Sequence, residues 1–202
     1  MKSYREEFET VYPRMDGIPD LYSIGKEELS VIFDMVYGLP RGAQVTIDIG
    51  GGRGRSAIIE ALAGAWTVVS VSPWTLDSGG AGNITEFKAH LDMAGVTKAV
   101  NILDMTSQEA SRMISNLGGL ADFIFLDANH GDGNPLQDTQ NWVRCLQKNG
   151  IFAFHDVSKD FPDVLDATSW LEMQGWEKVV ELGSIRGYRR PSGTLKERYR
   201  SK

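Results

Sequence analysis

Strand-like apolar runs alternate with helical patterns along most of the chain, and this alternation is the strongest constraint on its fold. Residues 26–37 carry apolar side chains at helical spacing, and the strand-like stretch 45–49 follows them. Further strand-like runs read WTVVSV, AVNIL, FIFLD and IFAFHD. Helices are expected at about 54–63, 83–93, 134–147 and 161–173. A further helix is expected to begin at the capping box formed by Thr106 and Glu109, and Pro135 stands at the first position of the helix 134–147. Strands joined by helices predict a parallel sheet covered on both faces.

The C-terminal part of the pattern departs from this alternation. Residues 176–190 read as two strands joined directly at Gly183 and Ser184, which predicts a hairpin with one antiparallel edge. A chain of 202 residues is long enough for one α/β domain with a sizeable core. We assign that domain to 24–190, preceded by an N-terminal segment 1–23 and followed by a flexible basic tail 191–202.

The composition of the chain limits the classes of molecule that it is expected to bind. The chain has 21 basic and 27 acidic residues and a net charge of −6, which argues against general affinity for nucleic acid or anionic membranes and favours a small-molecule substrate. The N-terminus lacks the apolar core of a signal peptide, and no stretch is long enough to span a bilayer, so a cytoplasmic protein is expected. The single cysteine, Cys145, falls in a stretch that reads as helix and is expected to be a buried structural thiol.

A glycine-rich turn follows the first predicted strand. In IDIGGGRGRSAI, residues 47–58, an aspartate near the strand's end precedes glycines at 50, 52 and 54, and a helix follows. Glycines let the backbone approach a ligand closely, and a helix N-terminus offers free N–H groups to an anionic group. The spacing is not the G-x-G-x-x-G of dinucleotide binding, and the P-loop lysine is absent. Hydride transfer and phosphoryl transfer are therefore disfavoured.

Four sequence motifs, taken with their order and spacing along the chain, resemble those of a known family. They are IDIGGGRGRSAI, DFIFLDANH, LQKNGIFAFHDV and GSIRGYRR, and the resemblance covers residues 24–190 approximately. With them the chain resembles the class I S-adenosylmethionine-dependent methyltransferases, and most closely the small-molecule O-methyltransferases related to the macrocin and catechol enzymes. The resemblance implies a Rossmann-like sheet of seven strands with a reversed last strand. It also implies S-adenosyl-L-methionine as the methyl donor, bound over the strand ends.

The resemblance implies a set of donor-binding residues. The amino acid end of the donor would lie at Asp48, Gly50, Gly52, Gly54 and Ser56, and the adenine at Asp104 and Met105. Trp74 would stack on the donor or cover the substrate, with loop packing as the alternative. Ser72 stands where the family usually has an acid that binds the ribose, and Asp77 is a substitute if its loop folds back. A charged acceptor contributes about 1.5–3 kcal/mol per hydrogen bond, so its loss weakens donor binding by roughly one to two orders of magnitude.

Acidic and histidine residues end the fourth and fifth predicted strands. Asp127 and Asp156 would converge on one divalent cation, Mg²⁺ or Mn²⁺, with His155 in the place of an acidic ligand in relatives. His130 is the candidate general base, beside Asp127 as the second catalytic residue. His90 is expected to be solvated. Asp132 and Asp138 are expected to be solvated as well, with a ligand role as the alternative if the loop NHGDGNP folds inward.

These features favour an O-methyltransferase that acts on a small hydroxylated molecule, a sugar, catechol or other phenol, with the help of a divalent metal. The alternatives are a metal-independent methyltransferase that uses His130 alone and a binding protein of the same fold with lost or altered catalysis. An apolar stripe, Tyr4, Phe8, Val11 and Tyr12, is expected to pack on the domain itself, with an acceptor-site cap or a homo-oligomer contact as alternatives.

Overall fold

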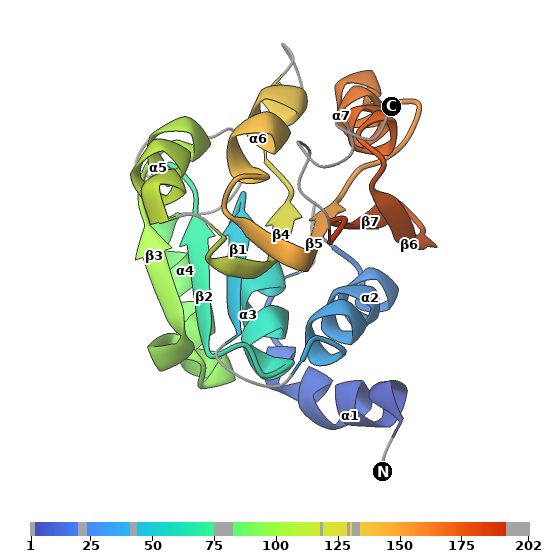
Figure 1. The fold of residues 1–202 in the computed structure, drawn as a ribbon. Helices are drawn as coiled ribbons and strands as arrows, with labels where there is room; N and C mark the ends of the chain where they lie inside the picture. Colours follow the sequence, from blue (N-terminus) through green and yellow to red (C-terminus); the bar gives the residue numbers. More distant parts are fainter. Residues whose placement is uncertain are drawn as a thin grey trace.

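One seven-stranded sheet forms the centre of the protein (Figure 1). The computed structural model describes residues 3–19, 24–40, 44–74, 83–117, 119–128, 130 and 134–192. Asp77, Asp132 and the tail beyond 192 lie outside the described residues. The strand order is β3-β2-β1-β4-β5-β7-β6. The strands are β1 (Val45–Ile49), β2 (Thr67–Val71), β3 (Val100–Leu103), β4 (Ala121–Leu126), β5 (Leu146–Phe154), β6 (Glu177–Leu182) and β7 (Ile185–Arg189).

The first five strands run parallel, and β7 pairs antiparallel with both β5 and β6. This arrangement confirms the predicted α/β fold with its C-terminal hairpin. Its carboxyl edge is where the candidate residues of the sequence gather, because each of them follows a parallel strand. The chain order changes direction at β1 and β4, which lie side by side in the sheet.

Helices cover both faces of the sheet (Figure 1). One face carries α2, α3 and α4, and the other carries α5, α6 and α7, as the two buried clusters of the core show. The helices are α1 (Tyr4–Val11), α2 (Lys26–Tyr37), α3 (Arg55–Leu62), α4 (Ile84–Ala94), α5 (Ser107–Ile114), α6 (Asn134–Trp142) and α7 (Pro162–Met173). Short 3₁₀ helices lie at Tyr12–Met15, Thr97–Ala99 and Ser115–Leu117.

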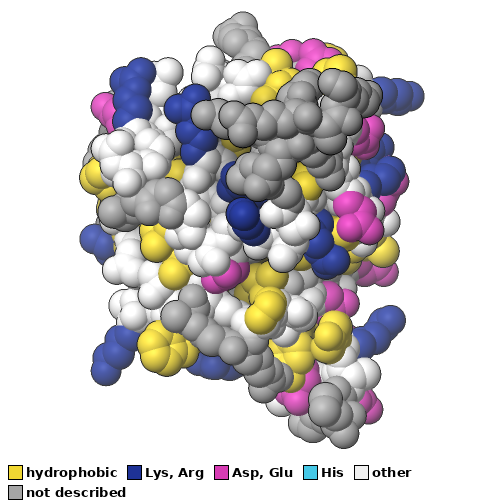
Figure 2. Space-filling view, viewed as in Figure 1, with side chains coloured by type: hydrophobic (Ala, Val, Ile, Leu, Met, Phe, Trp, Pro, Cys, Tyr) yellow, Lys and Arg dark blue, Asp and Glu magenta, His cyan; other side chains and the backbone are white. Residues whose placement is uncertain are grey.

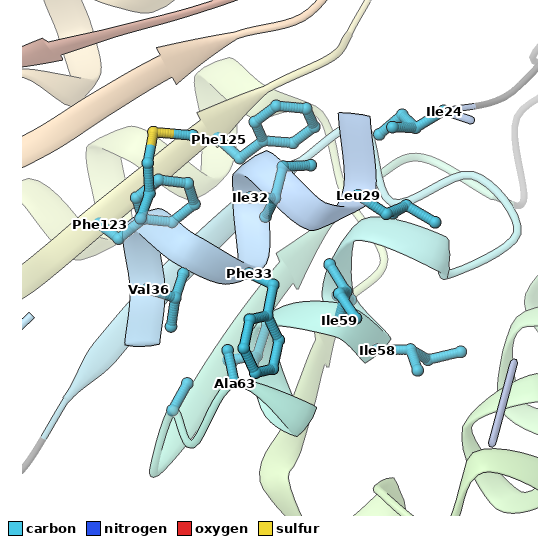
Figure 3. Packing of buried hydrophobic residues seen from close by; sticks show 14 of the residues in the cluster. Ile24, Leu29, Ile32, Phe33, Val36, Ile58, Ile59, Ala63, Phe123 and Phe125 are labelled. Carbon is cyan, nitrogen blue, oxygen red and sulfur yellow. The ribbon is translucent and has the colours of Figure 1, made fainter. Parts of the chain in front are cut away.

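The core on the α2 and α3 side is apolar and tightly closed. Ile32 and Phe33 of α2 pack with Ile59 of α3 and with the β4 side chains Phe123 and Phe125 (Figure 3). All five are nearly inaccessible to solvent. Burial of side chains of this size contributes about 1.5–3 kcal/mol each, so this layer fixes how α2 and α3 sit on the sheet.

The N-terminal stripe packs on the domain itself, as expected. Phe8 of α1 is buried with its ring 5.6 Å from that of Phe33, and Tyr4 lies edge-on to Tyr37 at 5.3 Å. Helix α1 thus extends the core below α2.

The prediction for the region around Cys145 was wrong. Helix α6 ends at Trp142, and Cys145 lies in the turn that leads into β5, which starts at Leu146 rather than near residue 151. The cause is backbone pairing with β4: the Cys145 carbonyl accepts a hydrogen bond from Ala121, and Leu146 is the register partner of Ala121. The thiol is nevertheless buried, and burial raises its pKa to about 11, as suits a structural cysteine.

The surface has no dominant charge on the face shown. Basic and acidic side chains are interspersed there (Figure 2). Among the described residues, no helix combines the length and apolar character needed to cross a membrane.

Glu60 is a buried carboxyl group in an apolar layer. It lies on α3 and has no exposed surface, and neither of its oxygens nor the Thr46 hydroxyl has a hydrogen-bond partner within the described part of the chain. Burial, together with the nearby charge of Asp48, raises the pKa of Glu60 well above its usual range, and the neighbouring Thr46 hydroxyl acts in the opposite direction without outweighing them. The folded protein therefore favours the neutral form of this group.

Glutamine at position 60 is expected to remove part of the pH dependence of stability. The folded state holds the Glu60 proton more tightly than the unfolded chain, so this group stabilises the fold fully below the ordinary glutamate pKa of about 4.3. That contribution is lost as the pH rises toward the raised pKa. In urea unfolding, the stability of Glu60→Gln relative to wild type is expected to increase by about 1 kcal/mol or more from about pH 5 to pH 8.

The exposed Glu177 supplies the control, because Glu177→Gln removes one negative charge without touching the core. Parallel pH dependences of Glu60→Gln and the wild type would contradict a neutral Glu60.

Candidate methyl-donor and metal site

The glycine turn between β1 and α3 is pressed against the end of β4. Gly50 has a φ of 98°, and a Cβ there would lie 2.0 Å from the Asp127 carbonyl oxygen. Gly54, with a φ of 94°, is the N-cap of α3 and lies against Phe87. No other residue type fits at Gly50, because both the left-handed backbone and the lack of space exclude a side chain. The glycine turn and the residues that directly follow β4 are therefore in close backbone contact.

Asp48 lies beneath this turn and is completely buried. Its two oxygens accept hydrogen bonds from the hydroxyls of Ser56, at 2.6 Å, and Ser70, at 2.7 Å. Burial raises the pKa of Asp48 to about 6 against the effect of these two bonds. The predicted donor residues Asp48 and Ser56 thus contact each other, and this contact ties α3 to β1 under the glycines.

Trp74 and His90 support the turn from the α4 side. The indole Nε1 of Trp74 donates to the Gly52 carbonyl at 2.8 Å, and its ring packs on Phe87 at 4.7 Å. His90 of α4 has its Nδ1 2.8 Å from the Arg53 carbonyl, so it is a partner of the turn rather than the solvated side chain that was predicted.

Arg55 is a contributor that the sequence reasoning missed. It is buried at the start of α3 and donates to the carbonyl oxygens of Ile18, at 2.9 Å, and Ile24, at 3.2 Å. These bonds attach the N-terminal segment to the beginning of α3, the helix that follows the glycine turn. A buried arginine whose partners are backbone carbonyls 30 or more residues away leaves no motif in the sequence.

The other predicted donor residues lie along the same edge of the sheet. Ser72 follows β2 and is buried, and its N–H donates to the Leu103 carbonyl at 3.2 Å. Asp104 and Met105 follow β3, where both are partly buried and Met105 packs on the core. Because β1, β2 and β3 are parallel neighbours, their ends bring these side chains to one edge, as a donor lying across the strand ends would require.

A second cluster follows β4 and β5. One ligand atom each from Asp127, His130 and Asp156 lies within 4.8 Å of the others, and all three side chains are partly exposed. His130 Nε2 lies 2.8 Å from Asp156 Oδ2 and 3.8 Å from Asp127 Oδ1, with Phe161 against the ring at 4.9 Å. Asp156 has a φ of 57°, an unusual backbone for a residue with a side chain and a common sign of a functional position.

His155 contacts the same two carboxylates and also reaches α2. Its Nδ1 lies 3.2 Å from Asp127 Oδ1 and 3.4 Å from Asp156 Oδ1, and its Nε2 lies 3.3 Å from Glu28 Oε2. Glu28, in the first turn of α2, is a second residue that the sequence reasoning missed.

These contacts change the charge states of the cluster. Burial acts to lower the pKa of His155, but hydrogen bonds to Asp127, Asp156 and Glu28 outweigh it and raise the pKa to about 12. Burial acts to raise the pKa of Asp156, but hydrogen bonds from His130 and His155 hold it well below its usual range. The hydrogen bond with His155 lowers the pKa of Glu28 to about 2. These contacts therefore favour the carboxylate forms of Glu28 and Asp156 and the protonated form of His155.

Asp138 is not a solvated loop acid, as had been predicted. It lies on α6, is buried, and accepts a hydrogen bond from Ser107 Oγ at 2.7 Å. Burial raises its pKa, and its partner is a helix α5 hydroxyl rather than the cluster.

Comparisons with known proteins agree with this geometry. Residues 47–157, from β1 to the end of the second cluster, match the model of the family described as "Methyltransferase domain". The chain belongs to this family. It is an S-adenosylmethionine-dependent methyltransferase of class I, as the sequence resemblance predicted. No curated protein matches the sequence.

Solved structures share the fold at low sequence identity. An O-methyltransferase from Bacillus cereus in complex with SAH is 16% identical over 94% of this chain and 92% of its own, with a TM-score of 0.65. TomG from Streptomyces achromogenes, an O-methyltransferase solved with SAM, is 15% identical over 94% and 91%, at 0.65. The SAH-bound methyltransferase PaMTH1 from Podospora anserina is 15% identical over 94% and 88%, at 0.67. At such identities the likeness establishes the fold.

Alanine at Gly50 is expected to destabilise the protein far more than alanine at Gly64. Both glycines have a φ near 100°, but a Cβ at Gly64 meets nothing within 4 Å, whereas at Gly50 it would meet the backbone of Asp127 and Ala128, just after β4. Gly64→Ala should cost about 1–2 kcal/mol for the left-handed backbone alone, and Gly50→Ala at least about 2 kcal/mol more. Urea unfolding of the two variants measures the difference. Equal losses would show that the turn and β4 are not in contact.

Proposed function

We propose that the protein transfers a methyl group from S-adenosylmethionine to a hydroxyl oxygen of a small molecule, with a divalent cation beside the acceptor. The observation that carries the proposal is the convergence of Asp127, His130 and Asp156 directly beside the glycine turn. Methyl transfer needs in-line placement of donor and acceptor and an acceptor oxygen that has lost its proton. The two neighbouring groups of residues match these two requirements.

The donor side relies on backbone rather than on a charged side chain. The glycine turn and the start of α3 would receive the carboxylate of the donor's amino acid end, because unpaired N–H groups at a helix N-terminus favour an anion. Asp48 is occupied by Ser56 and Ser70, so its role would be to hold the shape of the turn. Ser72, Asp104 and Met105 would line the ribose and adenine positions at the ends of β2 and β3.

The donor set fits a divalent cation. Two carboxylates and one imidazole suit Mn²⁺, Fe²⁺ or Zn²⁺ as well as Mg²⁺. We assign the histidine ligand to His130 in place of the predicted His155, because His130 completes the group whose ligand atoms lie within 4.8 Å of one another, whereas His155 Nε2 faces Glu28. When bound, such a cation lowers the pKa of an acceptor hydroxyl and orients it.

A metal-independent reaction is the second candidate. His130 Nε2 lies 2.8 Å from Asp156, which is the arrangement of a general base held by a carboxylate. In that case the imidazole would take the acceptor proton itself, and a chelator would not affect the rate.

The proposal is tested by transfer of labelled methyl groups to phenol, catechol and sugar hydroxyls, with and without chelator. Asp127→Asn is expected to lower kcat/KM at least about 100-fold. It removes a ligand of the proposed cation, and such a cation contributes several kcal/mol of charge stabilisation to the transition state. Asp166→Asn, at an exposed position of α7, is the matched control and is expected to leave the rate unchanged.

Two results would redirect the proposal. Full activity in chelator together with loss in His130→Ala would favour the metal-independent reaction. Methyl transfer only to nitrogen or sulfur acceptors would contradict O-methylation.

A further inference from the structure

Glu28 connects three parts of the chain that are far apart in sequence. Its Oε1 accepts hydrogen bonds from the Ser184 N–H, at 3.1 Å, and the Ser184 hydroxyl, at 2.7 Å, in the turn between β6 and β7. Its Oε2 lies 3.3 Å from His155 Nε2. One carboxylate of α2 thus joins the terminal hairpin to the residues that follow β5.

The orientation of the Glu28 carboxylate is set by the hairpin turn and by the start of α2. A backbone N–H can only donate, so the bond from Ser184 assigns Oε1 to the turn, and Oε2, which accepts from the Gly25 N–H at 3.4 Å, also faces His155. Gly183 has a φ of 58°, and a Cβ there would lie 2.9 Å from Glu28 Oε1, which shows how closely the turn backbone approaches. The side chain therefore has little freedom to turn away from His155.

His155 in turn contacts both carboxylates of the cluster. The Asp127 Oδ1 that it contacts at 3.2 Å also lies 3.8 Å from His130 Nε2. Its Nδ1 faces Asp127 Oδ1 and Asp156 Oδ1, while Asp156 Oδ2 faces His130 on the other side. With Oδ1 of Asp156 toward His155, its Oδ2 is presented toward His130 and the proposed cation. The position of the imidazole thus sets where the carboxylate oxygens lie.

We infer that Glu28 is a positioning residue for the proposed metal ligands: it holds the His155 ring in place, and the ring orients Asp127 and Asp156. This inference rests on the proposed metal site. Partners behind a first ligand layer fix the direction of the ligand atoms, and their loss typically lowers metal affinity about 10–100-fold. The β6–β7 hairpin contributes by holding Glu28.

The test compares Mn²⁺ binding by calorimetry in wild type, Glu28→Gln and Ser184→Ala. Glutamine keeps the length and the acceptor oxygen for the Ser184 N–H, so its amide nitrogen turns toward His155 Nε2 and removes the acceptor there. It also removes the weak bond from the Gly25 N–H, whose effect on the fold the unfolding midpoint reports. Ser184→Ala removes one bond to the turn and keeps the carboxylate on His155. Glu28→Gln is expected to weaken Mn²⁺ binding about tenfold or more, and Ser184→Ala by less than about threefold.

Unfolding midpoints and S-adenosylhomocysteine binding are measured on the same samples. A folded Glu28→Gln that binds Mn²⁺ as wild type does, or an equal loss in both variants, would overturn the inference. A wild-type protein that binds no Mn²⁺ would overturn it as well, since there would be no ligands to position. S-adenosylhomocysteine binding then decides separately whether the methyl-donor site stands.

Discussion

The contact between the glycine turn and the end of β4 is the constraint on which the rest of the site depends. The Gly50 backbone lies against the Asp127 carbonyl, and the Asp127 N–H donates to the Ile49 carbonyl at 2.8 Å. The turn that would hold the methyl donor and the first carboxylate of the acceptor side are thus neighbours through backbone alone. Their spacing follows from the strand order of the sheet, since β1 and β4 are adjacent where the chain changes direction.

Buried polar groups surround this contact, and they lower the stability of the fold while they hold the residues of the site in place. Asp48 keeps its carboxylate beneath the turn with two serine hydroxyls as partners, although burial raises its pKa. Glu60, further along α3, lies in the same layer without a partner among the described residues. Such groups cost stability compared with apolar ones. The second cluster also gathers polar groups in a partly buried place, because His155 lies among the carboxylates of Asp127, Asp156 and Glu28.

The order of elements could be predicted because periodicity and turn residues are local signals. The glycine turn, the strand ends and the Gly183 hairpin all appeared where the sequence placed them. The start of β5 at Leu146 was missed, because it depends on pairing with Ala121, a partner distant in sequence. Arg55 and Glu28 were missed for the same reason: each acts through residues brought together only by the fold.

Titration calorimetry of S-adenosylhomocysteine into the wild-type protein tests the central claim most directly, namely that the glycine turn binds a methyl donor although Ser72 replaces the ribose-binding acid. NAD⁺ serves as the comparison ligand, because the same class of sheet also binds dinucleotides. We expect S-adenosylhomocysteine to bind at one site per chain with a dissociation constant in the micromolar range, and NAD⁺ to show no comparable binding. Absence of S-adenosylhomocysteine binding, with and without Mg²⁺ or Mn²⁺, would contradict it.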